Sequence, residues 1–348
     1  MKKLLHNQLS KRDLIRRIQE ENKNRRTISF YKYHKIENPQ EFRDELFKNL
    51  SELNVLGRIY VAEEGINAQI SVPEKYLQNF IDYLSTYEFL KDIRLNIALE
   101  DDGKSFWKLI VRVRKKIVAD GIEDKNFSVE NKGEYLNAEE FNQLTENAET
   151  VIVDMRNYYE YEVGHFENAK EIPADTFREQ LPLAADLLAD KKDKPIIMYC
   201  TGGIRCEKAS AYLRYRGFKK VYHLEGGIIE YIRKVKENNL KNKFKGKNFV
   251  FDARMGERIT EDILSNCHQC GELCDIHRNC ENTGCHLLFI QCDKCFEKFD
   301  GCCCSECREI TQLPEDIQKE IRQSQNEESK LFSNSQKRRK AKLGGKLK

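Results

Sequence analysis

Alternating apolar and polar positions predict a first α/β unit over residues 27–120. The expected elements, in chain order, are a strand at 27–35, a helix at 39–53, two strands within 56–72, a helix from Pro73, and strands at 94–99 and 107–113. The first helix repeats apolar side chains at helical spacing, and Pro73 suits the first turn of the second helix. This order of elements is typical of a ferredoxin-like, split βαβ fold.

A second pattern predicts a parallel-sheet α/β domain over residues 135–240, after a charged linker at 114–133. Short apolar runs at 151–154 and 195–199 suit strands that are buried on both faces. Helical segments separate these runs, and another strand is expected at 220–224. Strands that alternate with helices indicate a parallel sheet covered on both sides.

Polar, basic segments lie at both ends of the chain. Residues 1–26 are expected to form a polar N-terminal arm, and residues 311–348 a basic, disordered tail. No run approaches the roughly 20 apolar residues of a membrane span, so no membrane partner is expected. The N-terminus lacks the apolar core of a signal peptide, which favours a cytoplasmic location. A net charge of only +3 does not by itself call for a polyanionic partner.

Cysteines are concentrated in a small module within residues 241–310. Eleven of the 13 lie between Cys267 and Cys307, and in a reducing compartment such clusters bind metal more often than they form disulfides. Two C-x-x-C pairs suit one tetrahedral structural zinc site, and an interleaved second site is expected. The candidate ligands of the first site are Cys267, Cys270, Cys292 and Cys295. Those of the second are Cys274, either Cys280 or Cys285, one of Cys302–Cys304 with Cys304 as the first choice, and Cys307. Disulfides and an iron–sulfur cluster are the alternatives.

One loop carries the clearest chemistry. A buried strand ends at Cys200, and a helix opens near Cys206. The intervening glycines allow backbone N–H groups to point inward, the helix contributes its positive end, and Arg205 adds a formal charge. These effects favour the thiolate, so Cys200 and Arg205 are the expected catalytic residues. The active-site loop comprises Thr201, Gly202, Gly203, Ile204 and Cys206. Cys206 is either a resolving thiol or a small packing residue.

Residues 135–235 resemble the rhodanese superfamily. The motifs that carry the resemblance are Asp154-Met155-Arg156, Glu160-Tyr161-x-x-Gly164-His165, the loop C-x-x-G-x-R at 200–205, and Leu224-Glu225-Gly226-Gly227. Two positions depart from the pattern, with Asn168 in place of a glycine and Tyr231 in place of a tryptophan. The resemblance implies a cysteine persulfide at Cys200. Asp154 and His165 are expected to brace the fold.

The order of domains resembles the TrhO (YceA-like) family of tRNA wobble-uridine hydroxylases. The matching stretches are Cys-Thr-Gly-Gly-Ile-Arg-Cys-Glu-Lys at 200–208, the linker at 247–258 and Cys-His-Gln-Cys-Gly at 267–271. The resemblance spans roughly residues 25–310. It implies an oxidoreductase of the EC 1.14 type that forms 5-hydroxyuridine, with tRNA as partner, dioxygen as co-substrate and an unknown electron donor. No flavin, haem or nicotinamide motif is visible, so we hypothesise that a thiolate or persulfide at Cys200 adds to uracil C6 and activates C5 toward oxygen.

A basic segment suggests where RNA would bind. Its residues are Lys108, Arg112, Arg114, Lys115 and Lys116. Basic side chains interleaved with aromatic ones can hold a phosphate backbone and stack bases, although a solvated sheet face would look the same. Two other functions remain open: a rhodanese-type sulfurtransferase, and a noncatalytic RNA-binding scaffold.

Overall fold

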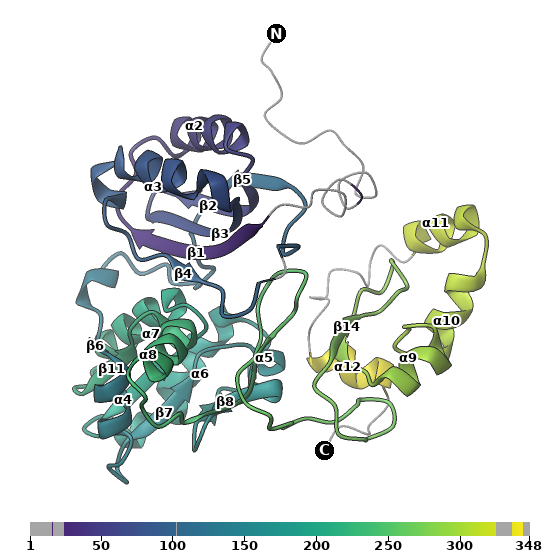
Figure 1. The fold of residues 1–348 in the computed structure, drawn as a ribbon. Coiled ribbons are helices and arrows are strands. Elements are labelled where there is room, and N and C mark those ends of the chain that lie inside the picture. The colour runs from purple at the N-terminus through teal and green to yellow at the C-terminus, as the bar shows by residue number, and fades with distance from the viewer. Residues whose placement is uncertain (1–15, 17–23, 102, 325–335, 344–348) are drawn as a thin grey trace.

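The computed structural model describes residues 16, 24–101, 103–324 and 336–343. It has three parts, shown in Figure 1: an N-terminal sheet domain, a parallel-sheet domain below it, and a cysteine-rich module to one side. Of the helices described, none is both long and apolar enough to cross a membrane. The expected fold class, an α/β chain with ferredoxin-like, rhodanese-like and cysteine-rich parts, is confirmed.

The N-terminal domain is built on one five-stranded sheet in the order β4-β1-β3-β2-β5. Its elements are β1 (Arg25–Tyr33), α2 (Pro39–Glu52), β2 (Leu56–Ala62), β3 (Gly65–Pro73), α3 (Leu77–Ser85), β4 (Asn96–Ile97) and β5 (Leu109–Val113), with short 3-10 turns at Glu74–Tyr76 and Glu88–Leu90. The first four strands pair antiparallel, as a split βαβ fold requires. β5 adds a parallel edge strand beside β2.

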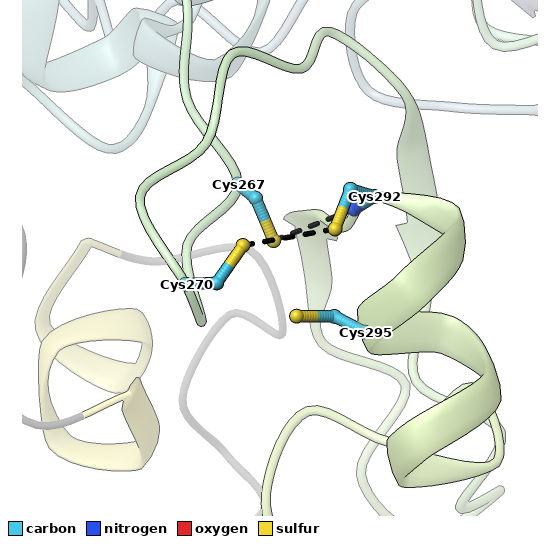
Figure 2. Close-up of side chains that lie close together, drawn as sticks. All are labelled: Cys267, Cys270, Cys292 and Cys295. Atoms are coloured by element: carbon cyan, nitrogen blue, oxygen red, sulfur yellow. Dashed lines mark hydrogen bonds between the residues drawn. The ribbon is translucent and has the colours of Figure 1, made fainter.

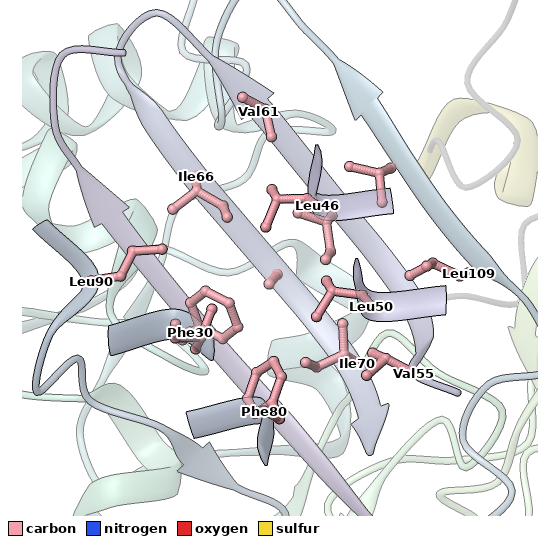
Figure 3. Close-up of a cluster of buried hydrophobic side chains, with 14 of the residues drawn as sticks. Phe30, Leu46, Leu50, Val55, Val61, Ile66, Ile70, Phe80, Leu90 and Leu109 are labelled. Atoms are coloured by element: carbon pink, nitrogen blue, oxygen red, sulfur yellow. The ribbon is translucent and has the colours of Figure 1, made fainter. Parts of the chain in front are cut away.

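The two faces of this sheet have different roles. One face carries apolar side chains such as Phe30, Ile66 and Ile70, which pack against Leu46 of α2 and Phe80 of α3 (Figure 3). Because side chains alternate along a strand, the opposite face presents the intervening polar residues. On this polar face the paired positions of β1 and β3 include Ser29 with Gln69 and Tyr31 with Asn67. The polar face lies toward the second domain (Figure 1).

The second domain has a parallel five-stranded sheet in the order β6-β11-β10-β7-β9. Its elements are β6 (Glu134–Leu136), α4 (Ala138–Leu144), β7 (Val151–Asp154), α5 (Tyr158–Val163), β9 (Lys170–Glu171), α6 (Phe177–Leu187), β10 (Ile196–Tyr199), α7 (Ile204–Tyr215), β11 (Val221–Leu224) and α8 (Gly227–Glu237), with 3-10 turns at Val129–Asn131 and Ala189–Lys191. Side chains of α6 and α7 pack on one face, and those of α4 and α8 on the other. The predicted parallel sheet with two helical layers is therefore confirmed.

The cysteine-rich module packs against α5. The chain reaches it through a small sheet of β8 (Gly164–Phe166), β12 (Phe244–Asn248) and β13 (Glu257–Arg258). The module contains β14 (His277–Asn279), β15 (Leu288–Ile290), α9 (Asp293–Phe299) and α10 (Ser305–Gln312). Tyr158, Tyr159 and Val163 of α5 share one buried cluster with Leu288 and Ile290 of β15. The helix that follows β7 thus lies between the sheet domain and the cysteine-rich module.

The C-terminal segment contains two helices, α11 (Glu315–Ser324) and α12 (Gln336–Leu343), so the prediction of a disordered tail is wrong for these residues. For α12 the reason lies in Arg339, which is buried and places its Nη1 2.6 Å from Glu162 Oε2. Its guanidinium also lies 4.5 Å from the centre of the Tyr158 ring. Basic residues that were expected to be solvated therefore dock α12 on α5. Most of the expected N-terminal arm lies outside the described residues, and Arg25 and Arg26 belong to β1.

Candidate active site

Cys200 stands at the carboxyl end of the central strand β10, where ligands gather in open parallel sheets. Gly203 has a φ of 100°, in the left-handed region that favours glycine, and its N–H donates to Cys200 Sγ over 3.1 Å. Gly227 is required for another reason: a side-chain carbon there would lie 2.5 Å from the carbonyl oxygen of Cys200. The loop sequence therefore directs backbone donors toward the sulfur, as expected.

Arg205 is held beside Cys200 by a carboxylate from a separate helix. Its Nη1 donates to Glu160 Oε2 over 2.7 Å and its Nη2 to Glu160 Oε1 over 2.8 Å. Glu160 belongs to α5 and is fully buried. Thr201 Oγ1 donates to the same carboxylate over 3.3 Å. Paired contacts of this kind fix the plane of the guanidinium more tightly than a single hydrogen bond would.

These contacts favour the thiolate form of Cys200. Burial opposes ionisation, but hydrogen bonding to the Cys206 thiol, the charge of Arg205 and the N–H of Gly203 together lower the pKa of Cys200 to about 6. The thiolate is the nucleophilic form of cysteine. Cys206, by contrast, is buried and faces the Cys200 sulfur, and both effects raise the pKa of Cys206 well above its usual value. Cys206 therefore stays protonated and acts as a donor to Cys200.

The N-terminal domain contacts the active-site loop and helix α7 directly, through hydrogen bonds and an ion pair. Tyr33 Oη donates to the carbonyl of Ile204 over 3.0 Å, and Tyr31 Oη donates to Glu207 Oε1 over 2.8 Å. Lys208 Nζ lies 2.7 Å from Glu64 Oε2 in the turn between β2 and β3. Helix α7 is thus attached along its first turns to the polar face of another domain.

A cavity of about 480 Å³ lies between the polar sheet face and the loop, and Cys200 lines it. This volume is within the range of about 300–1,000 Å³ that is typical of ligand sites. Other lining residues come from β1 to β4, from the segment before β5, from the active-site loop and from the segment after β12. They include Ser29, Tyr31, Arg58, Tyr60, Asn67, Gln69, Asn96, Phe106, Thr201, Gly202, Ile204, Arg205, Phe251 and Arg254. The lining includes both aromatic and amide side chains, which suits a planar, hydrogen-bonding ligand.

The basic residues singled out from the sequence lie at the β5 edge of the first sheet and just beyond it. Lys108, Arg112, Arg114 and Lys115 are exposed, and the Arg114 guanidinium lies 5.3 Å from the Tyr60 ring centre. Lys116 has a different role. Its Nζ donates to Asp120 Oδ1 and to the carbonyl of Ile122, each over 2.6 Å, so it braces the linker.

The cysteine-rich module brings eight thiols into two groups. One group holds Cys267, Cys270, Cys292 and Cys295 (Figure 2), and the other holds Cys280, Cys285, Cys303 and Cys307. Within each group every pair of sulfur atoms lies within 4.8 Å. The first group has the composition expected from the two C-x-x-C pairs. In the second, Cys303 is the member of the run 302–304 that takes part, rather than Cys304, and Cys274 belongs to neither group.

The spacing of the sulfur atoms fits a metal ion. Cys270 and Cys292 are 3.7 Å apart, and Cys285 and Cys303 are 3.8 Å apart. A tetrahedron with Zn–S bonds of about 2.3 Å has sulfur atoms roughly 3.8 Å from one another. All 13 cysteines of the chain are free thiols in this structure, and each group could hold a metal ion.

Fold and site together define a rhodanese-domain protein in which a second domain covers the reactive cysteine. Three family models match in turn: a UPF0176 acylphosphatase-like domain at residues 25–117, a rhodanese-like domain at 137–234 and a rhodanese C-terminal domain at 245–308. A tRNA uridine(34) hydroxylase from Enterobacter sp. (strain 638) is 58% identical over 342 residues, covering 98% of each chain. One from Photorhabdus laumondii is 57% identical, covering 96% of each chain. The protein belongs to the tRNA uridine(34) hydroxylase family.

Solved structures of rhodanese-like proteins match about a third of the chain or less. A rhodanese-like domain protein from Staphylococcus aureus is 29% identical over 28% of this chain and 90% of its own, with a TM-score of 0.24.

Several residues of the site were not identified from the sequence. Glu160 was noted only as part of a motif, although a glutamate in that motif is a natural partner for Arg205. Tyr31 and Tyr33 were not among the expected site residues, although their hydroxyls hold α7. No sequence pattern indicated Asn96 as a site residue, because its contact with Gly202 depends on how the two domains pack together. Asp154 and Arg156 form a fully buried ion pair, which is consistent with a bracing role.

Proposed function

We propose that this protein hydroxylates C5 of the wobble uridine of tRNA with dioxygen, and that Cys200 is the covalent nucleophile. The observation that carries the proposal is the Cys200 sulfur, which accepts from the Gly203 N–H beside Arg205 and lines a cavity that a second domain covers. The names of close relatives supply the substrate and the reaction class. A tRNA substrate places the reaction in the cytoplasm.

The first chemical step is addition of the Cys200 thiolate to C6 of the uracil ring. A carbon–sulfur bond forms, and the C5=C6 electron pair moves onto C5 and the C4 carbonyl oxygen. The resulting enolate carries negative charge that Arg205 and the loop N–H groups are placed to stabilise. C5 thereby becomes a much stronger carbon nucleophile than it is in the free uracil ring.

The second stage uses oxygen. C5 bonds to one atom of dioxygen, and a proton gives the C5 hydroperoxide. Two electrons and two protons from an external reductant cleave the O–O bond, leaving a C5 hydroxyl and water. Loss of the C5 proton and departure of the Cys200 sulfur restore the ring double bond and the thiolate. No flavin, haem or metal is required at C5 in this sequence of steps.

Exposed cations at the β5 edge are proposed to hold the tRNA backbone. Lys108, Arg112, Arg114 and Lys115 extend from the same sheet that covers the cavity. Phosphate contacts of this kind position a nucleic acid without reading its sequence. An anticodon-loop base is single-stranded, so it can enter a cavity without the cost of breaking a base pair.

The two cysteine groups are proposed to bind structural zinc. Each supplies four thiol ligands and leaves no coordination position for a substrate, as in closed structural sites. Zinc there would stabilise the module, because small domains with few apolar contacts draw folding free energy from metal binding. The chemistry at Cys200 proceeds without it.

Sulfur transfer is the second candidate, because the same loop would stabilise a persulfide at Cys200. One experiment separates the two functions. Purified protein is given an anticodon stem-loop with uridine at position 34, a thiol reductant and air, and the nucleosides are analysed by mass. We expect a gain of one oxygen atom that disappears without air. Thiosulfate-to-cyanide sulfur transfer without RNA, and no change in the uridine, would support a sulfurtransferase instead. Failure of both reactions would favour a noncatalytic scaffold.

A further inference from the structure

Asn96 is a polar residue of the N-terminal domain that lies against the active-site loop. It begins β4 and pairs with Ser29 of β1, and its side chain is only 5% exposed. Its Nδ2 donates to the carbonyl of Gly202 over 3.4 Å. A side-chain carbon at Gly202 would also lie 3.4 Å from that same nitrogen. The amide is therefore held against the loop two residues after Cys200.

The oxygen atom of this amide has no hydrogen-bond donor. Asn96 Oδ1 is buried and has no hydrogen-bond partner. Ten buried side-chain atoms in the described part of the chain lack a partner, and only Asn96 Oδ1 belongs to a residue that lines the cavity. An unpaired buried acceptor costs about 1–3 kcal/mol, so each such atom calls for an explanation. Asn96 lines the cavity, so a small rotation of its amide would bring Oδ1 to a donor group of a ligand bound there.

We propose that Asn96 reads the imide edge of the target uracil, an inference that rests on the proposed function. Oδ1 accepts from N3–H, and the second hydrogen of Nδ2, not used on Gly202, donates to the neighbouring O4 or O2. An amide side chain recognises paired donor and acceptor groups on a base in this way. Cytosine has an acceptor at N3, so the lone pair of N3 would face a lone pair of Asn96 Oδ1, and the two would repel each other. Asn96 thus selects uridine over cytidine.

This contact also orients the ring for the chemistry. In a six-membered ring N3 lies directly opposite C6, the atom that the Cys200 sulfur must reach. Fixing N3 at Asn96 turns C6 away from the polar sheet face. Asn96 and Cys200 both line the cavity, one on the sheet and one on the loop. The sheet domain therefore acts as the base-reading half of the site, and the loop as the reacting half.

The test compares stem-loops that carry uridine or N3-methyluridine at position 34. Methylation removes the N3 donor, so wild-type kcat/KM should fall by at least about 100-fold. In the Asn96→Ala variant, kcat/KM for uridine should fall about 10- to 100-fold, because the donor then lacks its acceptor. The N3-methyl penalty should shrink to a few-fold, since the two changes remove the same contact. Ile97→Thr changes the exposed neighbour on the other side of β4 and should keep the full penalty.

Each outcome decides between defined alternatives. An unchanged N3-methyl penalty in Asn96→Ala overturns the inference while leaving the proposed function intact. Failure of the wild type to hydroxylate either RNA overturns the proposed function itself. If circular dichroism shows that the alanine variant is unfolded, the same assay is carried out with Asn96→Ser, whose polar side chain is smaller than that of asparagine.

Discussion

Arg205 and Glu160 form a two-pronged ion pair beside Cys200, with both nitrogen–oxygen distances below 3 Å. The carboxylate is buried, and it belongs to the helix that packs against the cysteine-rich module. The cation at the site is therefore positioned by α5, while Cys200 is positioned by β10. Substitutions that move α5 relative to the sheet should therefore also move Arg205 relative to the Cys200 sulfur.

The first prediction concerns the charge at residue 205. The pKa of Cys200 is lowered to about 6, so its alkylation by iodoacetamide should rise as pH increases through 6 and level off above it. Arg205→Gln removes the cation and leaves Glu160 unpaired, and both effects disfavour the thiolate. The alkylation midpoint should then move up by about one to three pH units. Arg216→Gln, after the end of α7, serves as the control and should leave the midpoint unchanged.

A second prediction concerns Gly203. A Gly203→Ala side chain would meet Tyr31 Oη at 2.8 Å in a left-handed backbone conformation. We expect about 1–2 kcal/mol of lost stability from the backbone alone. We also expect at least about a tenfold fall in kcat, because the N–H that donates to Cys200 is displaced. Gly217→Ala has a similar φ of 88° and nothing nearer than 3.9 Å, so it should lose stability without losing kcat. Equal kcat values for both variants would contradict this account.

A third prediction concerns metal content. Elemental analysis of the purified protein should find two zinc ions per chain, one for each cysteine group. Cys303→Ser should lose one ion, whereas the adjacent Cys304→Ser should lose none, because Cys304 lies outside both groups. Loss of zinc in Cys304→Ser with retention in Cys303→Ser would show that the ligand assignment is wrong.

A fourth prediction concerns RNA affinity. Replacing Lys108, Arg112 and Arg114 together with Ala should weaken tRNA binding and reduce the slope of log K against log salt by about 2, at roughly 0.7 for each phosphate contact. Binding at several salt concentrations gives the slope. A matched control changes three exposed lysines at the amino ends of the parallel strands, away from the Cys200 edge: Lys194, Lys219 and Lys220. If both triple variants have the same slope, RNA does not bind at the β5 edge.

Much of the fold could be predicted because its signals are local. Alternation in 27–35 and helical spacing in 39–53 each depend on a few neighbouring residues, and they correspond to β1 and α2 within two residues at either end. The Cys200 loop could be predicted equally well, since its strand, glycines and helix are consecutive in the sequence. Local order of this kind does not require knowledge of how domains meet.

Contacts between distant segments could not be predicted in the same way. The hydroxyls of Tyr31 and Tyr33 reach α7 across more than 170 residues, and nothing in the local pattern of β1 indicates that. Three consecutive cysteines, 302–304, have no periodicity that tells which one turns toward Cys280. From the sequence alone, Arg339 cannot be distinguished from the solvated basic residues around it, because its partners Glu162 and Tyr158 are distant in the chain.

The most direct test of the account is single-turnover hydroxylation of a uridine-34 stem-loop under ¹⁸O₂, comparing wild-type protein with Cys200→Ala. The account predicts 5-hydroxyuridine carrying one ¹⁸O atom with the wild type, and none above background with the variant. Labelled product formed by Cys200→Ala at the wild-type rate would contradict it, because the chemistry would then proceed without the sulfur that the whole site is arranged to ionise.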